Sequence, residues 1–128
     1  MRMTILIVDD NAQGRALLRG MVAQEPACQV VGEAEDGAEA IRLAQALRPD
    51  IVLLDLTMPR VNGLEALRQI KGERPETQVL IVTVHAEDAY RRAAADGGAD
   101  AFLLKKTLVT VLLPTIQRLR GSLPPPAS

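Results

Sequence analysis

Polar side chains of three chemical kinds follow four apolar runs of the sequence. The runs cover residues 3–8, 51–54, 79–82 and 101–104, and the side chains that follow them are Asp9, Asp10, Asp55, Thr83 and Lys105. Carboxylates, a hydroxyl and an ammonium group together suit phosphoryl transfer, in which one carboxylate is the nucleophile and the other groups bind the phosphoryl oxygens. Asp55 is the candidate nucleophile, because it ends the unbroken run 51–54 of a predicted central strand.

Three carboxylates in one crevice require a compensating positive charge. Two carboxylates about 4 Å apart repel by roughly 4 kcal/mol at an effective dielectric of about 20. Lys105 supplies one charge, and Mg²⁺, which prefers oxygen ligands, would supply the rest. A zinc site is disfavoured because His85 and Cys28 are the only histidine and cysteine of the chain. The residues after the first run lack the glycines of a phosphate-binding loop, which disfavours nucleotide binding.

The apolar runs predict buried strands of a parallel sheet, with a further short strand at residues 29–33. Segments with helical spacing separate the strands, and five strands alternating with five helices predict an α/β fold with a doubly wound parallel sheet. In the strand order 2-1-3-4-5, the four polar strand ends are contiguous and converge on one crevice. The predicted inward stripes of the first two helices are Leu17, Leu18, Met21 and Val22, and then Ala40, Ile41, Leu43, Ala44 and Leu47.

Four short motifs carry a resemblance to a known family. They are Val8-Asp9-Asp10, the segment from Asp55 to Pro59 with Asn62-Gly63, the single Thr83, and the segment from Gly98 to Lys105. In order and spacing, over about residues 4–120, the chain resembles the receiver (REC) domain of two-component response regulators and is similar to the LuxR/NarL-type subgroup. The fold implied is the flavodoxin-like, or CheY-like, five-stranded sheet with five helices.

The resemblance implies a phosphorylation site at Asp55 that takes its phosphoryl group from a sensor histidine kinase or a small phosphodonor. It implies that Asp10, Asp55 and the backbone carbonyl of Thr57 bind Mg²⁺, and that Asp9 acts through water. A domain of this kind is not an enzyme in the usual sense, because it catalyses only its own phosphotransfer and dephosphorylation.

The resemblance also implies a switch. Thr83 and Lys105 would contact the phosphoryl group, and Phe102 would turn inward and alter the face made by the fourth helix, fifth strand and fifth helix. Phe102 stands where tyrosine is commoner, so an immobile core aromatic is the alternative. The family often has a cis proline after the lysine, whereas Lys106 follows here and predicts a trans bond. Pro114 predicts a bend or a late start of the last helix.

Length and charge set the remaining expectations. The 128 residues suit one domain over residues 1–120 and a proline-rich tail or linker over 121–128. A net charge of -1 gives no reason for direct DNA or membrane binding. We therefore expect DNA to be reached, for transcription control, only through an output domain absent from this sequence. Phosphorylation-dependent homodimerisation is a further expectation. A single cysteine without a signal peptide predicts a cytoplasmic location.

Two other functions compete with the switch. A pseudo-receiver would act through protein contacts without phosphorylation, and the intact set of acids, threonine and lysine argues against it. A haloacid-dehalogenase-type phosphatase also uses an aspartate nucleophile, but that family has Asp-x-Asp after its first strand, whereas Thr57 lies two residues after Asp55 here.

Overall fold

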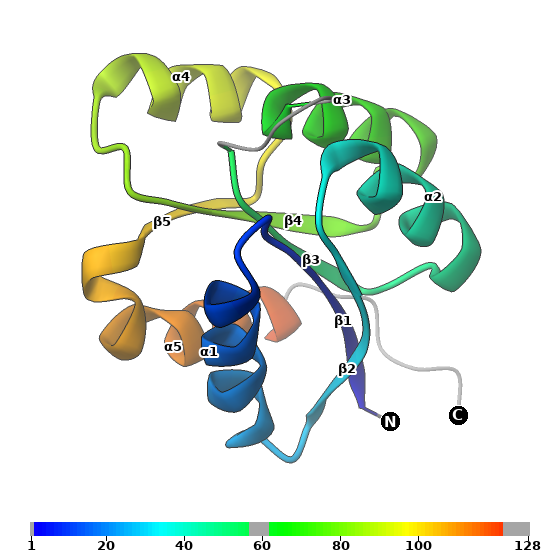
Figure 1. Ribbon diagram of the computed structural model, residues 1–128, viewed down its shortest axis with the longest axis vertical. Coiled ribbons are helices and arrows are strands. Elements are labelled where there is room, and N and C mark those ends of the chain that lie inside the picture. The colour runs from blue at the N-terminus through cyan, green and yellow to red at the C-terminus, as the bar shows by residue number, and fades with distance from the viewer. Residues whose placement is uncertain (1, 57–61, 122–128) are drawn as a thin grey trace.

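The structure is a computed structural model that describes residues 2–56 and 62–121. Strands and helices alternate along the whole described chain (Figure 1). The strands are β1 (Met3–Val8), β2 (Cys28–Ala34), β3 (Ile51–Leu54), β4 (Gln78–Thr83) and β5 (Ala101–Leu104). The helices are α1 (Ala12–Ala23), α2 (Gly37–Leu47), α3 (Gly63–Glu73), α4 (Asp88–Asp96) and α5 (Leu108–Gly121), with a short 3₁₀ turn at Lys105–Thr107 before α5.

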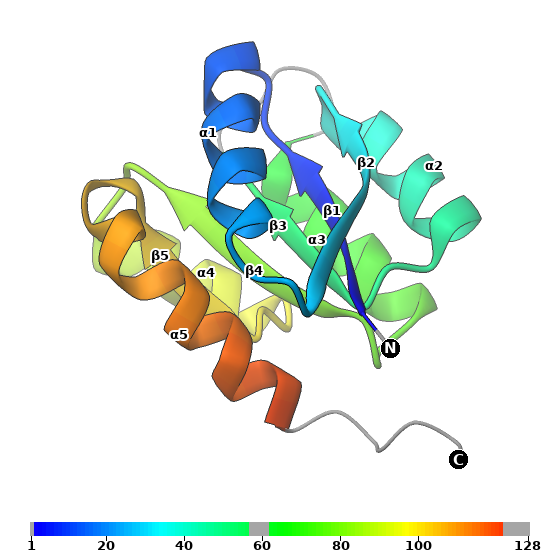
Figure 2. The same cartoon turned by 90° about the horizontal axis from the view of Figure 1, so that it is seen from below.

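The five strands form one parallel sheet in the order β2-β1-β3-β4-β5. This confirms the predicted doubly wound fold. The chain reverses its direction of winding between β1 and β3, and the carboxyl ends of both strands meet there (Figure 2). Ligands of open α/β sheets bind at such a switch point, so the fold itself selects the candidate site.

Helices cover both faces of the sheet, as Figures 1 and 2 show. Helices α1 and α5 pack on one face, where Ile5, Ile7 and Leu53 point, and α2, α3 and α4 pack on the other, where Leu6 and Val8 point. Because β1 and β3 are buried on both faces, their side chains are apolar without alternation, apart from Thr4 near the start of β1. The apolar runs that predicted these strands are therefore a direct consequence of the two helical layers.

The predicted inward orientation of Leu17 is wrong, because this residue of α1 is 56% exposed. Leu47 of α2 is 40% exposed, yet its Cδ1 lies over Gly32 of β2, where a Cβ would meet it at 2.8 Å. Leu18 and Val22 are the buried positions of α1, while α2 contacts the sheet through the small residues Ala40 and Ala44. Each helix carries more apolar residues than one face can bury.

The structure of the last helix and of the loop before it tests the predictions made for Pro114 and for the peptide bond before Lys106. Helix α5 begins at Leu108 and continues through the exposed Pro114, so of the predicted bend or late start, the late start is wrong. The predicted trans bond before Lys106 is confirmed, because the described residues contain no cis peptide bond. Residues 122–128 of the predicted tail lie outside the described residues. Among the described helices, none has the length and apolar character to cross a membrane.

Candidate functional site

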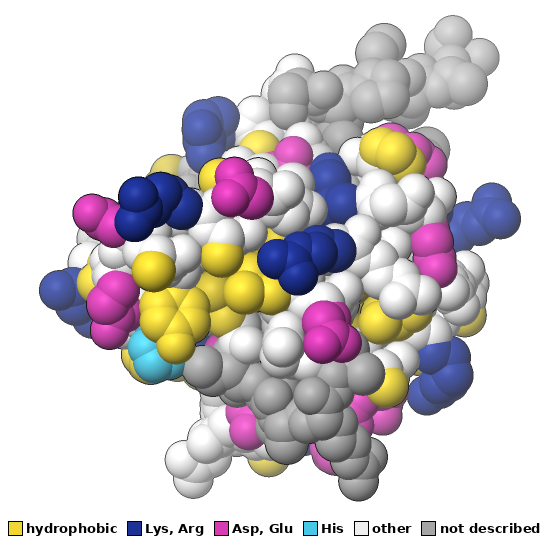
Figure 3. Space-filling view, turned by 90° about the horizontal axis from the view of Figure 1, so that it is seen from above, with side chains coloured by type: hydrophobic (Ala, Val, Ile, Leu, Met, Phe, Trp, Pro, Cys, Tyr) yellow, Lys and Arg dark blue, Asp and Glu magenta, His cyan; other side chains and the backbone are white. Residues whose placement is uncertain are grey.

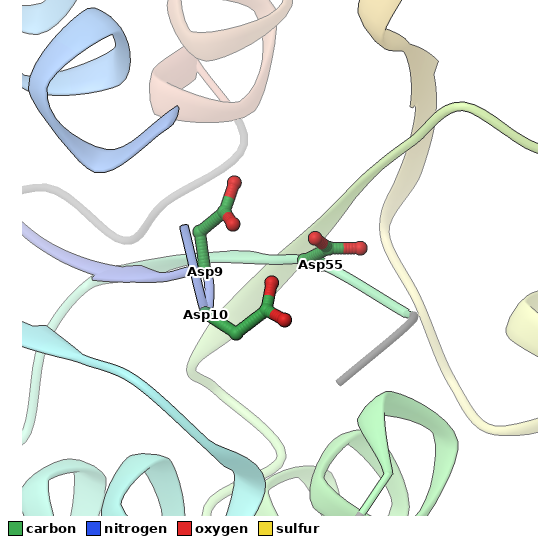
Figure 4. Close-up of side chains that lie close together, drawn as sticks. All are labelled: Asp9, Asp10 and Asp55. Carbon is green, nitrogen blue, oxygen red and sulfur yellow. The ribbon is translucent and has the colours of Figure 1, made fainter. Parts of the chain in front are cut away.

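Three carboxylates gather at the switch point of the sheet (Figure 4). Asp9 and Asp10 follow β1, Asp55 follows β3, and one oxygen from each lies within 4.8 Å of the others. Asp9 and Asp55 are buried, whereas Asp10 is exposed. Oxygen-only ligands at this spacing, open to solvent on one side, fit a small hard cation that keeps part of its water shell, such as Mg²⁺. The sequence prediction that these three residues meet is confirmed.

Lys105, which follows β5 at the same edge of the sheet, provides the positive charge. Its Nζ lies 3.2 Å from Asp9 Oδ2 and 3.3 Å from Asp55 Oδ2. Burial acts to lower the pKa of Lys105, but the two carboxylates together outweigh burial, and the pKa is raised above its ordinary value of 10.5. Lys105 is therefore a permanent cation of the site at physiological pH.

The start of α1 holds Asp9 in place. The Asp9 amide donates to Ala34 O at 3.1 Å, and the Asp9 carbonyl accepts from Arg15 Nη1 at 2.7 Å. The Asn11 amide donates to Asp9 Oδ1 at 2.9 Å, while the Asn11 side chain caps α1 by accepting from the backbone of Gln13 and Gly14. Arg15 and Gly14 were not predicted as site residues, because each has a role only through its tertiary contact with Asp9.

Thr83 and Phe102 lie on the two strands beyond β3. Thr83 is fully buried at the end of β4, and its Oγ1 accepts a hydrogen bond from the His85 amide at 3.1 Å. Phe102 of β5 is partly buried and lies under the guanidinium of Arg91, whose Cζ is 4.7 Å from the ring centroid. The His85 ring stacks on Tyr90 with 4.4 Å between centroids. These contacts make one surface of aromatic and cationic groups along α4, and Figure 3 shows the histidine there beside hydrophobic side chains.

Gly63, the first residue of α3, lies against the backbone at the end of β3. A Cβ on Gly63 would lie 2.5 Å from Leu56 Cα, and closer still to the Asp55 carbonyl oxygen. Because both are backbone atoms, Gly63→Ala should displace the segment that carries Asp55 and lower the free energy of unfolding by about 1–3 kcal/mol, measured by urea unfolding. Gly72→Ala is the matched control in the same helix, since a Cβ there meets nothing within 4 Å. Equal unfolding midpoints for the two variants would contradict this prediction.

Comparison with known proteins decides the family. The response regulator receiver domain family matches residues 5–117. This chain belongs to that family. The transcriptional regulatory protein YdfI of Bacillus subtilis (strain 168) is 40% identical over 119 residues, which are 92% of this chain and 55% of that protein. The signal receiver domain of NarL from Mycobacterium tuberculosis has a TM-score of 0.86 at 30% identity, and the match covers 94% of this chain and 98% of that one.

The resemblance of this receiver domain to the LuxR/NarL-type subgroup is thereby confirmed. A further relative is named for an enzyme activity: protein-glutamate methylesterase/protein-glutamine glutaminase 4 of Myxococcus xanthus (strain DK1622) is 43% identical over 104 residues, 81% of this chain and 30% of that protein. The chain thus spans 30–55% of the length of these two curated relatives. Receiver domains of this kind are signalling modules, and the match leaves nearly half of YdfI and more than two thirds of the methylesterase outside the compared region.

Proposed function

We propose that this receiver domain is a phosphorylation-controlled switch, in which Asp55 accepts a phosphoryl group from the phosphohistidine of a sensor histidine kinase or from a small phosphodonor. One observation carries the proposal: Asp55 shares its pocket with two carboxylates within 4.8 Å and with the Lys105 ammonium at 3.3 Å. A buried carboxylate beside a permanent cation is held ready as a nucleophile whose charge is partly offset.

The acidic residues would hold Mg²⁺. Asp10 and Asp55 offer direct oxygen ligands, and Asp9, which Lys105 and Asn11 already bind, would act through a water molecule. The further ligand expected from the sequence, the backbone carbonyl of Thr57, lies outside the described residues. When bound, the ion supplies positive charge that offsets both the carboxylates and the phosphoryl oxygens.

The transfer itself needs one bond to form and one to break. A carboxylate oxygen of Asp55 attacks phosphorus, and an acyl phosphate forms on Asp55 as the bond to the donor breaks. From a phosphohistidine protonated on its other ring nitrogen, the phosphorus–nitrogen bond breaks and neutral imidazole leaves; from acetyl phosphate, a phosphorus–oxygen bond breaks and acetate leaves. Lys105 then pairs with a phosphoryl oxygen, and the Thr83 hydroxyl donates a hydrogen bond to another. Hydrolysis by water restores the carboxylate. Beyond these two self-directed reactions we propose no enzymatic activity for the domain.

The switch would run from Thr83 to the surface of α4, β5 and α5. When the Thr83 hydroxyl donates a hydrogen bond to the phosphoryl group, the Thr83 side chain leaves its contact with the His85 amide. This movement makes room for Phe102 to turn inward. One or two charge-assisted hydrogen bonds at about 1.5–3 kcal/mol each shift a two-state equilibrium by a factor of about 10². That factor is large enough to change which partners the surface binds.

Arg91 is expected to hold Phe102 outward in the unphosphorylated protein. A cation–π contact at an exposed site contributes about 0.5–1 kcal/mol, so Arg91→Ala should raise the inward population about twofold to fivefold. Phe102 is the only phenylalanine of the chain, so fluorophenylalanine labelling gives a single ¹⁹F resonance whose shift reports the two positions. Arg92→Ala is the control, because Arg92 is the exposed next residue of the same helix. Identical ¹⁹F spectra for the two variants would show that Arg91 does not hold the ring.

The output of the switch lies outside this domain. Because relatives such as YdfI are transcriptional regulators and extend well beyond the matched region, we propose that the phosphorylated surface controls transcription through a DNA-binding output domain. Homodimerisation on phosphorylation would couple two such domains. We also propose a cytoplasmic location, because the proposed phosphoryl donor is a sensor histidine kinase.

Incubation with acetyl phosphate and Mg²⁺ tests the proposed function. Intact-mass spectrometry should show the gain of one phosphoryl group, stable for minutes, in the wild type and none in Asp55→Asn. Asp96→Asn, an exposed acid at the end of α4, is the control that should retain the gain. Turnover of many equivalents of acetyl phosphate would instead indicate a phosphatase. The absence of both mass gain and turnover would indicate a pseudo-receiver that acts by protein contacts alone.

A further inference from the structure

The Asp9 carboxylate lies against α1 at a point where the helix has no side chain. An ideal Cβ on Gly14 would lie 2.6 Å from Asp9 Oδ2 and 3.1 Å from Asp9 Cγ. Atoms in van der Waals contact need well over 3 Å, so a methyl group at residue 14 and the carboxylate in this position exclude each other. Gly14 is also inside a helix, where glycine is otherwise less favourable than alanine.

Neither backbone can easily move to make room for such a methyl group. Both backbone groups of Asp9 are engaged, the amide with Ala34 O at 3.1 Å and the carbonyl with Arg15 Nη1 at 2.7 Å. Helix α1 is fixed by its buried residues Leu18 and Val22. The side chain of Asp9 is therefore the part that has to give way.

The present position of the carboxylate is defined by two donors. Oδ1 accepts from the Asn11 amide at 2.9 Å, and Oδ2 accepts from Lys105 Nζ at 3.2 Å. The oxygen that faces Gly14 is the one that Lys105 binds. A methyl group at residue 14 would therefore disrupt the hydrogen bond between Asp9 Oδ2 and Lys105 Nζ. A carboxylate rotated away from α1 loses this link and its fixed distance from Asp10 and Asp55.

We propose that Gly14 is a positioning residue for the acidic site. By leaving space beside Oδ2, it lets the Asp9 carboxylate keep the orientation in which Asn11 and Lys105 hold it and in which it completes the set of oxygens around Mg²⁺. The metal part of this inference rests on the proposed function, whereas the steric coupling between Gly14 and Asp9 does not.

Magnesium titration by isothermal calorimetry tests the metal part. Groups that orient a metal site change its affinity by about tenfold or more when altered, so Gly14→Ala should weaken Mg²⁺ binding by about tenfold. Gly20→Ala is the matched control, since it lies in the same helix and a Cβ there meets nothing within 4 Å. Binding by Gly14→Ala that equals binding by Gly20→Ala, or that is tighter than in the wild type, would overturn the assignment.

A double-mutant cycle with Asp9→Ala tests the coupling itself. Removing the carboxylate removes what a Cβ at residue 14 would meet, so Gly14→Ala should lower the urea midpoint in the wild-type background and not lower it in the Asp9→Ala background. The same loss in both backgrounds would overturn the proposal. This cycle is run without metal, so it decides the role of Gly14 even if the wild type binds no Mg²⁺ and the proposed function fails.

Discussion

Replacing Lys71 with methionine is expected to lower the free energy of unfolding by about 3 kcal/mol. Lys71 Nζ donates to Pro75 O at 2.8 Å, to Thr77 O at 2.9 Å and to Asp100 Oδ2 at 3.0 Å. The same Asp100 oxygen accepts from the Val79 amide at 2.8 Å. Breaking a fully buried ion pair costs about 3–5 kcal/mol, and because this pair is only partly buried, with side chains 16% and 27% exposed, the low end of that range applies.

The measurement is urea unfolding, and the control is Arg68→Met on the exposed side of the same helix. A surface substitution of this kind changes stability by about 0.5 kcal/mol or less. Asp100→Asn should fall between the two, because the amide oxygen can still accept from Val79 while the charge pair with Lys71 is lost. An unfolding midpoint of Lys71→Met that matches Arg68→Met would show that the three contacts of the ammonium contribute nothing net.

The sequence predicted the sheet and the meeting of its polar ends for one physical reason. Strands covered on both faces must be apolar throughout, so the residues that interrupt the runs, such as Asp9 and Asp55, mark where each strand leaves the core. In a parallel sheet the carboxyl ends of all strands lie on the same side of the sheet. The identity of the residue at each strand end was therefore enough to place Asp9, Asp10, Asp55 and Lys105 together.

The helix faces were less predictable because apolar residues exceed the area available for burial. Leu17 fits the helical spacing of α1 as well as Leu18 does, but only Leu18 reaches the sheet. Which of two adjacent apolar residues turns inward depends on the angle at which the helix packs. That angle is set by residues far away in the sequence, which a reading of one helix does not contain.

Polar contacts between distant segments were not predicted at all. Lys71 and Asp100 are 29 residues apart, and at each position the sequence alone predicts an exposed charged side chain. Gly14 likewise resembles a weak point of a helix until Asp9 is seen beside it. In both cases the residue type has a meaning only through its partner, so the sequence of one chain carries no signal for it.

Lys105→Met is expected to slow phosphorylation of Asp55 by acetyl phosphate at least about 100-fold. Removing one group that stabilises transition-state charge costs about 10²–10³ in rate, and Lys105 is the cation that contacts both Asp55 and Asp9 among the described residues. Methionine keeps most of the apolar side-chain length, so the loss should come from the charge. Lys106→Met is the control, because Lys106 is the exposed next residue.

The pH dependence separates a loss of charge from a loss of packing. The folded pKa of Lys105 is raised above 10.5, so the ammonium is fully present below that value and is lost only as the pH rises through the raised pKa. The ratio of wild-type to Lys105→Met rates, measured by intact mass, should therefore stay constant from pH 7 to about 10 and shrink only at still higher pH. A ratio that already shrinks between pH 7 and about 9 would mean that Lys105 titrates within the physiological range, which its two carboxylate neighbours should prevent.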